Sequence, residues 1–228
     1  MPTTLLSESF AAANDGSLTA SAGSGSGVID YPAGYATYCA HLFVGDDASG
    51  VIAIYGTFAA LGTGKGVTAT WKQKFAATQN TTASWGSLWK LNVSGGTTDG
   101  VDVQVYRTSS SGKWKFRITD AAAGHWQSAD TAYITVSSYV DVKVEVYLHA
   151  TAGKARLTIG GEVVTATNVN TMADGDIAEA RWYLSGGSAT KNMESWADNI
   201  LVTDELAADW LPAAGNPYYY YAMMRRNS

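Results

Sequence analysis

The stretch "YVDVKVEVYLH", residues 139–149, decides the fold class. Apolar and polar side chains alternate along it with a period of two, which places one set toward a core and the other toward solvent. The apolar set is Val140, Val142, Val144, Val146 and Leu148, and the polar set is Tyr139, Asp141, Lys143, Glu145, Tyr147 and His149. The stretch therefore predicts a long antiparallel strand with one wet face.

The same alternation recurs along the chain, whereas a helical period hardly appears. Strands expected at 101–107 and 113–119 are separated by "TSSSG", which predicts a hairpin turn. The Gly- and Ser-rich residues 14–27 are expected to form a flexible surface loop. Further strands are expected at 5–10, 35–44, 51–58, 66–76, 85–93, 154–160, 178–185 and 194–203. So many short strands predict an all-β fold, a sandwich of two antiparallel sheets.

Composition narrows the classes of function. The formal net charge is −5, which argues against nucleic-acid binding because such binding needs a clustered basic face. No window approaches the roughly 18 uninterrupted apolar residues that a membrane span needs, so no membrane partner is expected. Cys39 is the single cysteine and is expected to be a small core residue.

No break in composition divides the strands into two sets, so we predict one domain over residues 1–206 and a separate tail over 207–228. The tail differs chemically from the body. All 20 acidic residues lie at or before Asp209, whereas residues 210–228 carry two arginines and no acid.

Two segments carry a resemblance to a known family. The first is "YVDVKVEVYLHATAGKARLTIGGEVVTATNVNT" and the second "AEARWYLSGGSATKNMESWADNILVTDE", which ends in the pattern aromatic, any, Asp, Asn, Ile, any, Val at 196–202. They resemble the laminin-G-like members of the concanavalin A-like jelly-roll superfamily, in the form found in bacteriophage virion proteins. The opening "LLSESF" resembles the family's first strand, which lies beside the last. The resemblance implies a jelly roll in a virion. Synthesis in the host cytoplasm is expected because the start "MPTTLLSESF" lacks the basic and long apolar regions of a signal peptide.

Catalytic motifs of related enzymes are missing from the sequence. The β-glucan-cleaving members resemble one another in a strand of alternating carboxylates, and the nearest stretch here has Lys143 between Asp141 and Glu145. Neither strand motif of the alginate-lyase branch, Arg-x-Glu-x-Arg or Gln-Ile/Val-His, occurs. We therefore predict an ion-paired outer face at 141–145, no catalytic residue and no enzyme activity.

Asp198 is the candidate metal ligand. It is in phase with Trp196, Ile200 and Val202, so a regular strand buries its carboxylate, which then needs a partner. The resemblance implies a structural Ca²⁺ between the first and last strands, held by Asp198 with Glu8 nearby. The alternative is that Asp198 accepts backbone N–H groups or that a bulge turns it outward.

Three residues are candidates for glycan binding: Trp85 in "TQNTTASWGS", and His125 and Trp126 in "AAGHWQSAD". Lectin sites combine a stacking aromatic ring with short polar side chains in loops, and "TQNTTASWGS" and "SGGSATKN", residues 185–192, have that composition, as ordinary turns also do. His125 lies beside Trp126 in an expected loop or strand edge, where a sugar contact is conceivable. Core packing explains Trp85 equally well, because it is in phase with Trp89.

The terminal "NPYYYYAMMRRNS", residues 216–228, is rich in residue types that are enriched in binding hot spots. It predicts an arm that docks on another subunit; the alternatives are an arm that covers an edge strand of its own sheet and a disordered terminus. The predicted partner-binding residues are Trp210, Tyr218, Tyr219, Tyr220, Tyr221, Met223, Met224, Arg225 and Arg226.

Three hypotheses of function follow. The first is a non-enzymatic structural protein of a bacteriophage particle, a capsid decoration, cement or tail-associated subunit that docks on other virion proteins and on copies of itself. The second is a carbohydrate-binding module that recognises a surface glycan. The third is a divergent glycan hydrolase or lyase. No cofactor is predicted apart from the structural Ca²⁺.

Overall fold

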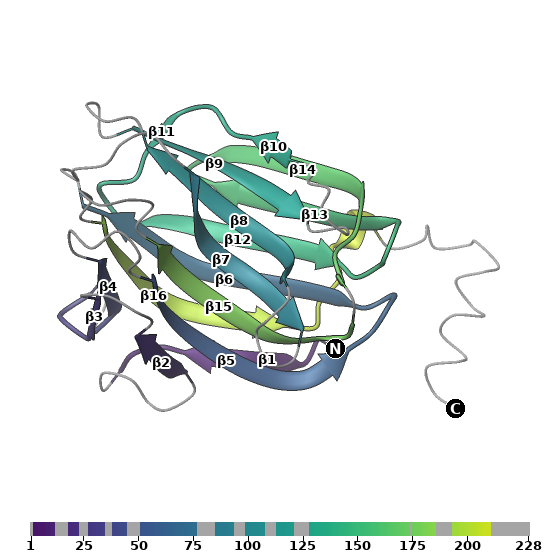
Figure 1. Ribbon diagram of the computed structural model, residues 1–228, viewed down its shortest axis with the longest axis horizontal. Coiled ribbons are helices and arrows are strands. Elements are labelled where there is room, and N and C mark those ends of the chain that lie inside the picture. Colours follow the sequence, from purple (N-terminus) through teal and green to yellow (C-terminus); the bar gives the residue numbers. More distant parts are fainter. Residues whose placement is uncertain are drawn as a thin grey trace.

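Two antiparallel β-sheets stack across one core, as the sequence predicts (Figure 1). The computed structural model describes residues 2–11, 18–22, 27–34, 38–44, 51–76, 85–93, 99–107, 113–120, 128–173, 175–185 and 193–210. Among these residues the only helical element is a single 3-10 turn, and the chain is an all-β sandwich.

The first sheet, called sheet A, contains the strand formed by the alternating stretch at 139–149. In spatial order it consists of β14 (Glu162–Val169), β13 (Gly153–Ile159), β12 (Val140–Tyr147), β6 (Gly66–Phe75), β16 (Met193–Thr203), β4 (Ala40–Val44) and β3 (Gly27–Asp30). Strand β1 (Thr4–Glu8) pairs with the second half of β16, with Leu6 opposite Val202. The first strand thus lies beside the last, as the resemblance implies.

The second sheet, called sheet B, lies in front in Figure 1. In spatial order it consists of β10 (Ser128–Asp130), β9 (Lys113–Asp120), β8 (Asp99–Arg107), β7 (Trp85–Val93), β15 (Ile177–Ser185), β5 (Val51–Leu61) and β2 (Thr19–Ala22). The short β11 (Ile134–Thr135) also pairs with β9. The predicted hairpin of β8 and β9 is confirmed.

The core between the sheets follows from the period-two alternation. Val142, Val144 and Val146 of β12 are buried, and sheet B contributes Trp89 and Trp182 from the other side. Each fully buried aliphatic side chain stabilises the fold by roughly 1.5–3 kcal/mol, so the alternation itself holds the sandwich together. The indole of Trp71 in β6 meets that of Trp182 edge to face, with ring centroids 5.9 Å apart.

Two parts of the strand prediction need correction. The stretch 14–27 is not wholly a loop, because β2 lies within it and Leu18 is buried in the core. Strands β3, β10, β11 and β14 were not predicted: the first three have at most four residues each, and in β14 the inward residues are partly alanine and the outward residues mostly threonine and asparagine. The turn that leads into it, Gly160-Gly161, has positive φ at both positions, which suits a tight two-residue hairpin.

After β16 the chain turns back onto sheet A. Ala207 is buried, and the 3-10 turn η1 (Ala208–Trp210) rests on β13. Both carboxylate oxygens of Asp209 accept hydrogen bonds from the Arg156 guanidinium, at 2.8 and 3.0 Å. That guanidinium also lies 5.1 Å from the centre of the Trp210 ring. Contacts with the body therefore continue to residue 210, beyond the predicted boundary at 206.

The rest of the predicted docking arm, 211–228, lies outside the described residues. This includes Tyr218, Tyr219, Tyr220, Tyr221, Met223, Met224, Arg225 and Arg226. In the part of the chain that the structure describes, no helix has the length and hydropathy to cross a membrane.

Candidate functional site

The outer side of sheet B, facing away from the core, carries a dense set of polar and aromatic side chains. Alternation along β8 sends Val101, Val103 and Val105 into the core and Asp102 and Gln104 to the outer side. Neighbouring strands place their outward residues in register with these. We call the following residues the polar face of sheet B: Tyr55, Trp85, Ser87, Lys90, Asn92, Asp99, Asp102, Gln104, Tyr106, Lys115, Arg117, Thr119, Asp130, Glu179, Arg181 and Tyr183.

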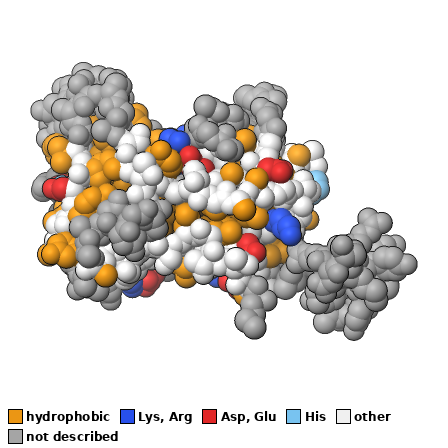
Figure 2. All heavy atoms as spheres, turned by 90° about the horizontal axis from the view of Figure 1, so that it is seen from below, with side chains coloured by type: hydrophobic (Ala, Val, Ile, Leu, Met, Phe, Trp, Pro, Cys, Tyr) orange, Lys and Arg blue, Asp and Glu red, His pale blue; other side chains and the backbone are white. Residues whose placement is uncertain are grey.

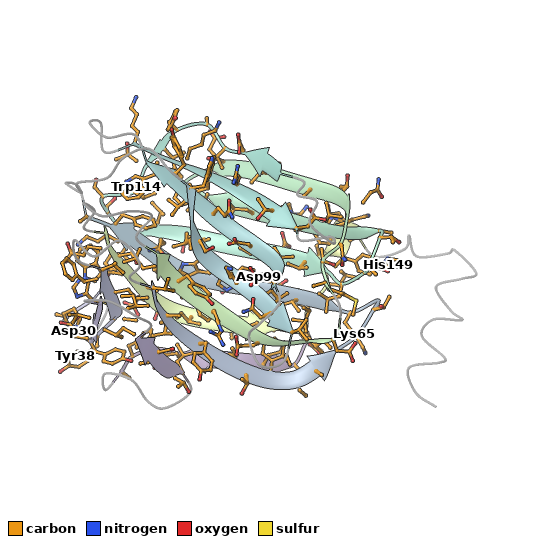
Figure 3. The ribbon with its side chains drawn as sticks, in the orientation of Figure 1. Asp30, Tyr38, Lys65, Asp99, Trp114 and His149 are labelled. Carbon is orange, nitrogen blue, oxygen red and sulfur yellow. The ribbon has the colours of Figure 1, made fainter. Side chains whose placement is uncertain are left out.

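This face is more enclosed than an ordinary solvent-exposed sheet surface. Asp102 and Glu179 are each only 2% exposed, although charged residues are rarely so buried unless they are paired. Asp99, labelled in Figure 3, lies at the start of β8 and forms an ion pair with Lys90 of β7. Charged side chains on this face are therefore held by one another instead of extending into water.

One hydrogen-bond chain runs across three strands. Arg117 Nε of β9 donates to Gln104 Oε1 at 2.8 Å, and Gln104 Nε2 donates to Asp102 Oδ2 at 2.8 Å. From the other side, the hydroxyl of Ser87 in β7 donates to the same Asp102 oxygen at 2.9 Å. Each member fixes the next, so this part of the face is organised before any ligand arrives.

Asp102 has an unusual electrostatic environment. Burial raises the pKa of its carboxyl group, opposed by the nearby Lys90 ammonium and by hydrogen bonds from Gln104 and Ser87. Its second oxygen, Oδ1, is buried and has no hydrogen-bond partner among the described residues. For Lys90, burial alone would lower the pKa, but the charges of Asp102 and Asp99 hold it above its usual value.

A second group surrounds Arg181 of β15. Its guanidinium is bound through Nε and Nη2 to the carboxylate of Glu179, and Nη2 lies 3.1 Å from Glu179 Oε2. These hydrogen bonds raise the pKa of Arg181. The same guanidinium lies 4.6 Å from the ring centre of Tyr55, and the Lys90 ammonium lies 5.1 Å from that of Tyr183. Both tyrosine rings are thus positioned by cations.

Trp85 belongs to a third group on the polar face, together with Arg117 and Tyr106. The Arg117 guanidinium lies 4.1 Å from its ring centre, and the Tyr106 ring is 5.1 Å away. Trp85 pairs with Tyr106, whereas Trp89 pairs with the core residue Val103, because the register of β7 shifts between Ser87 and Trp89. The bulge separates two tryptophans that the sequence puts in phase, and only Trp89 belongs to the core.

The polar face can therefore offer half-buried rings beside fixed hydrogen-bond donors and acceptors. Aromatic rings present an apolar surface, and the neighbouring Gln104, Arg117 and Arg181 supply directional polar contacts. A ligand with alternating C–H and hydroxyl groups matches this combination, because such a ligand needs both kinds of contact at once.

Of the predicted glycan-binding residues, the structure places Trp85 on this face. His125 and Trp126 lie outside the described residues. The sequence pattern does not single out the other residues of the face, although "KWKFRIT" and "VDVQVYR" each show a polar side. The face could not be predicted because the alternation within one strand does not show which other strands lie beside it.

The candidate metal ligands are both buried, at 1% exposure for Glu8 and 0% for Asp198. Glu8 Oε1 accepts the backbone N–H of Phe10 at 2.8 Å, and Asp198 Oδ1 accepts that of Asn199 at 2.7 Å. Within the described ranges no three or more His, Cys, Asp or Glu side chains gather in a way that could hold a metal ion. The Ca²⁺ site stays a prediction.

Asp198 is buried, as predicted, but a bulge places it on the outer side of its sheet, which is the alternative that the sequence leaves open. Trp196 lies opposite His41 and stacks on its ring with centroids 4.9 Å apart, on the outer side of sheet A, while Ala197 is in the core. The register of β16 then shifts between Asp198 and Leu201, and Asn199 has φ of 52°. This bulge returns the following residues to the core, so Asp198 is buried on the outer side of its sheet.

The predicted ion-paired face of β12 is confirmed. Asp141 pairs with Lys72 at 2.7 Å, and Glu145 pairs with Lys143 at 2.8 Å and with Arg156 at 2.7 Å. Burial alone would raise the pKa of Glu145, but the hydrogen bonds from Arg156 and Lys143 hold it below its usual value. These carboxylates serve the structure of sheet A.

Comparison with known proteins supports the fold. Neither a protein-family model nor a curated protein sequence matches the chain. Among solved structures, the chain is similar to the CBM2 module of the evolved Dit of Lactobacillus casei BL23 phage J-1, with TM-score 0.60, 14% identity, and 92% of this chain and 98% of that one covered.

Two other solved structures share the architecture. An alginate lyase from Klebsiella pneumoniae has TM-score 0.59 and 7% identity, with 78% of this chain and 85% of that chain covered. Botulinum neurotoxin type C, whose cell entry depends on two ganglioside molecules, has TM-score 0.57 and 10% identity, with 97% and 51% covered. The chain therefore has the β-sandwich jelly-roll fold predicted from its sequence.

Proposed function

We propose that this chain is a non-enzymatic carbohydrate-binding module of a bacteriophage particle that binds a surface glycan through the polar face of sheet B. The observation that supports the proposal is the set of half-buried rings, Tyr55, Trp85 and Tyr183, held beside a hydrogen-bonded polar network. The similarity to a carbohydrate-binding module of a phage Dit supports both the ligand class and the virion location.

The arrangement of charges favours binding over catalysis. A general acid or base must reach the proton that it transfers, whereas Asp102 and Glu179 are almost wholly buried. Asp99 forms an ion pair with Lys90, and Asp130 forms one with Lys115. The carboxylates of the face thus hold basic groups in position, and we assign none of them a role in a reaction.

The position of η1 supports attachment of the module to the phage particle through sheet A, the sheet opposite the polar face. Trp210 and Asp209 contact Arg156 on the outer side of sheet A, and β1 is also part of that sheet. A tail that continues from residue 210 to other virion proteins or to further copies of the chain would leave sheet B free. In this proposal the docking role expected for the tail and the glycan role of the polar face work together.

Electrostatics do not favour a nucleic-acid partner. Over the described part of the surface in Figure 2, Lys and Arg side chains are scattered, with Asp and Glu between them. Phosphate backbones are bound by gathered basic groups, because binding releases counterions in proportion to the number of neutralised phosphates.

A glycan microarray carrying bacterial surface polysaccharides tests the proposal. The wild-type protein is expected to bind a defined subset, and Trp85→Ala and Tyr55→Ala should each weaken that binding by about tenfold, since a stacked ring contributes on the order of 1.5 kcal/mol. Tyr147→Ala is the matched control, because Tyr147 is a half-buried ring on the outer side of sheet A.

Circular dichroism checks that each variant keeps its fold. Binding that survives both sheet B substitutions, or that disappears with Tyr147→Ala alone, would contradict the assignment of the site. A folded wild-type protein that binds no member of the array would contradict glycan binding itself.

A further inference from the structure

We infer that the polar face of sheet B selects uncharged glycans and discriminates against polymers that carry carboxylate or phosphate groups. The inference rests on the proposed glycan-binding function and adds the chemical class of the ligand. It depends on how the basic side chains of the face are already engaged.

The Lys90 ammonium is neutralised within the face. It forms an ion pair with Asp99, and the two side chains are 16% and 23% exposed. Asp102 on the adjoining strand adds a second negative charge, and Tyr183 covers another side of the ammonium. A carboxylate of a ligand that approached Lys90 would therefore have to displace Asp99 or lie beside it.

The Arg181 guanidinium already makes hydrogen bonds through its N–H groups and contacts an aromatic ring with its planar face. Nε and Nη2 bind Glu179, Nη1 lies 3.5 Å from the hydroxyl of Tyr183, and the plane lies over Tyr55. Arginine binds acidic sugars best through two parallel N–H groups, and Glu179 already uses such a pair. Because Glu179 is 2% exposed, displacing it would leave a buried carboxylate without its partner.

The other basic groups near the centre are engaged in different ways, Arg117 by a neutral amide and a ring and Lys115 by a carboxylate. Arg117 donates a hydrogen bond to Gln104 and lies over the Trp85 ring. It also interacts electrostatically with the carboxylates of Asp130 and Asp102. Lys115 pairs with Asp130 at 3.0 Å. Lys113, at the end of β9, is exposed and lies at the margin where β9 pairs with β11.

The formal charges of the named face balance. Lys90, Lys115, Arg117 and Arg181 give four positive charges, and the four negative charges belong to Asp99, Asp102, Asp130 and Glu179. At Lys90, Lys115 and Arg181 an acidic ligand would compete with a carboxylate that already pairs with the basic group, and like charges side by side oppose binding. A sugar hydroxyl both donates and accepts, so it can bond to either member of a pair without disturbing it.

Pairs of polysaccharides that share a backbone test the inference. Suitable probes are a neutral mannan with polymannuronate, a galactan with polygalacturonate, and a glucan with polyglucuronate, each titrated by calorimetry. At least one neutral member is expected to bind, and its acidic counterpart should bind at least tenfold more weakly.

Removing one acid of the face provides the second arm of the test. Asp99→Asn frees the Lys90 ammonium, so it should improve binding of the acidic member of the bound pair by roughly threefold or more. Asp141→Asn is the matched control, because it makes the same charge change on the outer side of sheet A, where Asp141 pairs with Lys72. It should leave both affinities unchanged.

The outcomes separate the two proposals. An acidic member that binds as tightly as its neutral counterpart, with binding lost in Trp85→Ala, overturns charge selection and leaves the glycan site in place. An equal gain from Asp99→Asn and Asp141→Asn would assign the effect to net charge and also overturn the inference. Failure of all three pairs to bind counts against glycan binding and charge selection together.

Discussion

Asp102 shows how far the polar face departs from an ordinary sheet surface. Its carboxyl group is 2% exposed, has one oxygen without a hydrogen-bond partner among the described residues, and has a raised pKa because of its burial. A buried, incompletely bonded carboxyl group destabilises a fold, and such groups persist mainly where they serve binding.

Replacing Asp102 with asparagine should change how stability depends on pH. The pKa of this carboxyl is higher in the folded chain than in the unfolded chain, so the folded state binds the proton more tightly. Its contribution is therefore most favourable below the unfolded pKa and declines as the pH rises from there through the folded pKa. Asp102→Asn should remove that decline while leaving an acceptor for Ser87.

Urea unfolding at a series of pH values from 4 to 7 checks this expectation. The difference in free energy of unfolding between variant and wild type should shift in favour of the variant as the pH rises. A difference that is constant over this range would show that Asp102 has the same pKa in both states.

Two bulges decide which residues of their strands meet solvent. In β7 the register shift after Ser87 brings Trp85 to the polar face, and in β16 the shift after Asp198 brings Trp196 to the outer side of sheet A. Both strands look regular in the sequence. A single extra residue moves every side chain beyond it to the other face, which explains why the sequence puts Trp196 in phase with core residues and leaves Trp85 undecided between core and surface.

The β16 bulge depends on the backbone of Asn199, whose φ is 52°. Asparagine tolerates this conformation, glycine adopts it freely and a β-branched residue is strained there. We expect Asn199→Val to lower the free energy of unfolding by about 1–2 kcal/mol and Asn199→Gly to change it by less than about 0.5 kcal/mol. Equal effects of the two substitutions in chemical denaturation would contradict the bulge.

The ion pair that joins β12 and β13 should stabilise the fold in a pH-dependent way. Arg156→Met leaves the buried Glu145 with Lys143 alone and should cost about 2 kcal/mol at neutral pH. Hydrogen bonds hold the pKa of Glu145 below its unfolded value, so this stabilisation is present above the unfolded pKa and disappears as the pH falls through the folded pKa.

Thermal or urea unfolding of wild type and Arg156→Met at pH 7 and at pH 3 checks the sign. The difference in free energy of unfolding between wild type and Arg156→Met should be smaller at pH 3 than at pH 7. Lys143→Met is the control and should cost less, because the Lys143 side chain is 48% exposed and its pair with Glu145 is better screened. A difference in free energy of unfolding that is larger at pH 3 than at pH 7 would contradict the stabilising role of the ion pair between Arg156 and Glu145.

At the scale of the whole molecule, the proposal assigns attachment to sheet A and glycan binding to sheet B. Sheet A contains β1 and receives η1, so the chain enters and leaves the described body on that side. Sheet B lies on the opposite side of the sandwich (Figure 1), and its outer side carries the polar face. A domain attached through sheet A would present sheet B outward, as a module that recognises a surface requires.

Most of the fold can be predicted from the sequence, but little of the candidate site can. Alternation in 139–149 and in its neighbours predicts the strands and the sandwich, because burial of one strand face leaves a pattern of period two. The polar face comes from six strands, β5, β7, β8, β9, β10 and β15, and β5 and β15 are distant from the others along the chain. Arg181, Lys90 and Tyr55 become neighbours only through the pairing of β15 with β7 and β5, which no local pattern records.

The most direct test of the central claim is a two-dimensional NMR measurement of the tryptophan indole N–H signals during titration with the best-bound glycan. The Trp85 signal, assigned with Trp85→Phe, is expected to shift progressively, while those of Trp196 and Trp210 on sheet A stay in place. If Trp196 or Trp210 responded and Trp85 did not, the polar face of sheet B would not be the binding site.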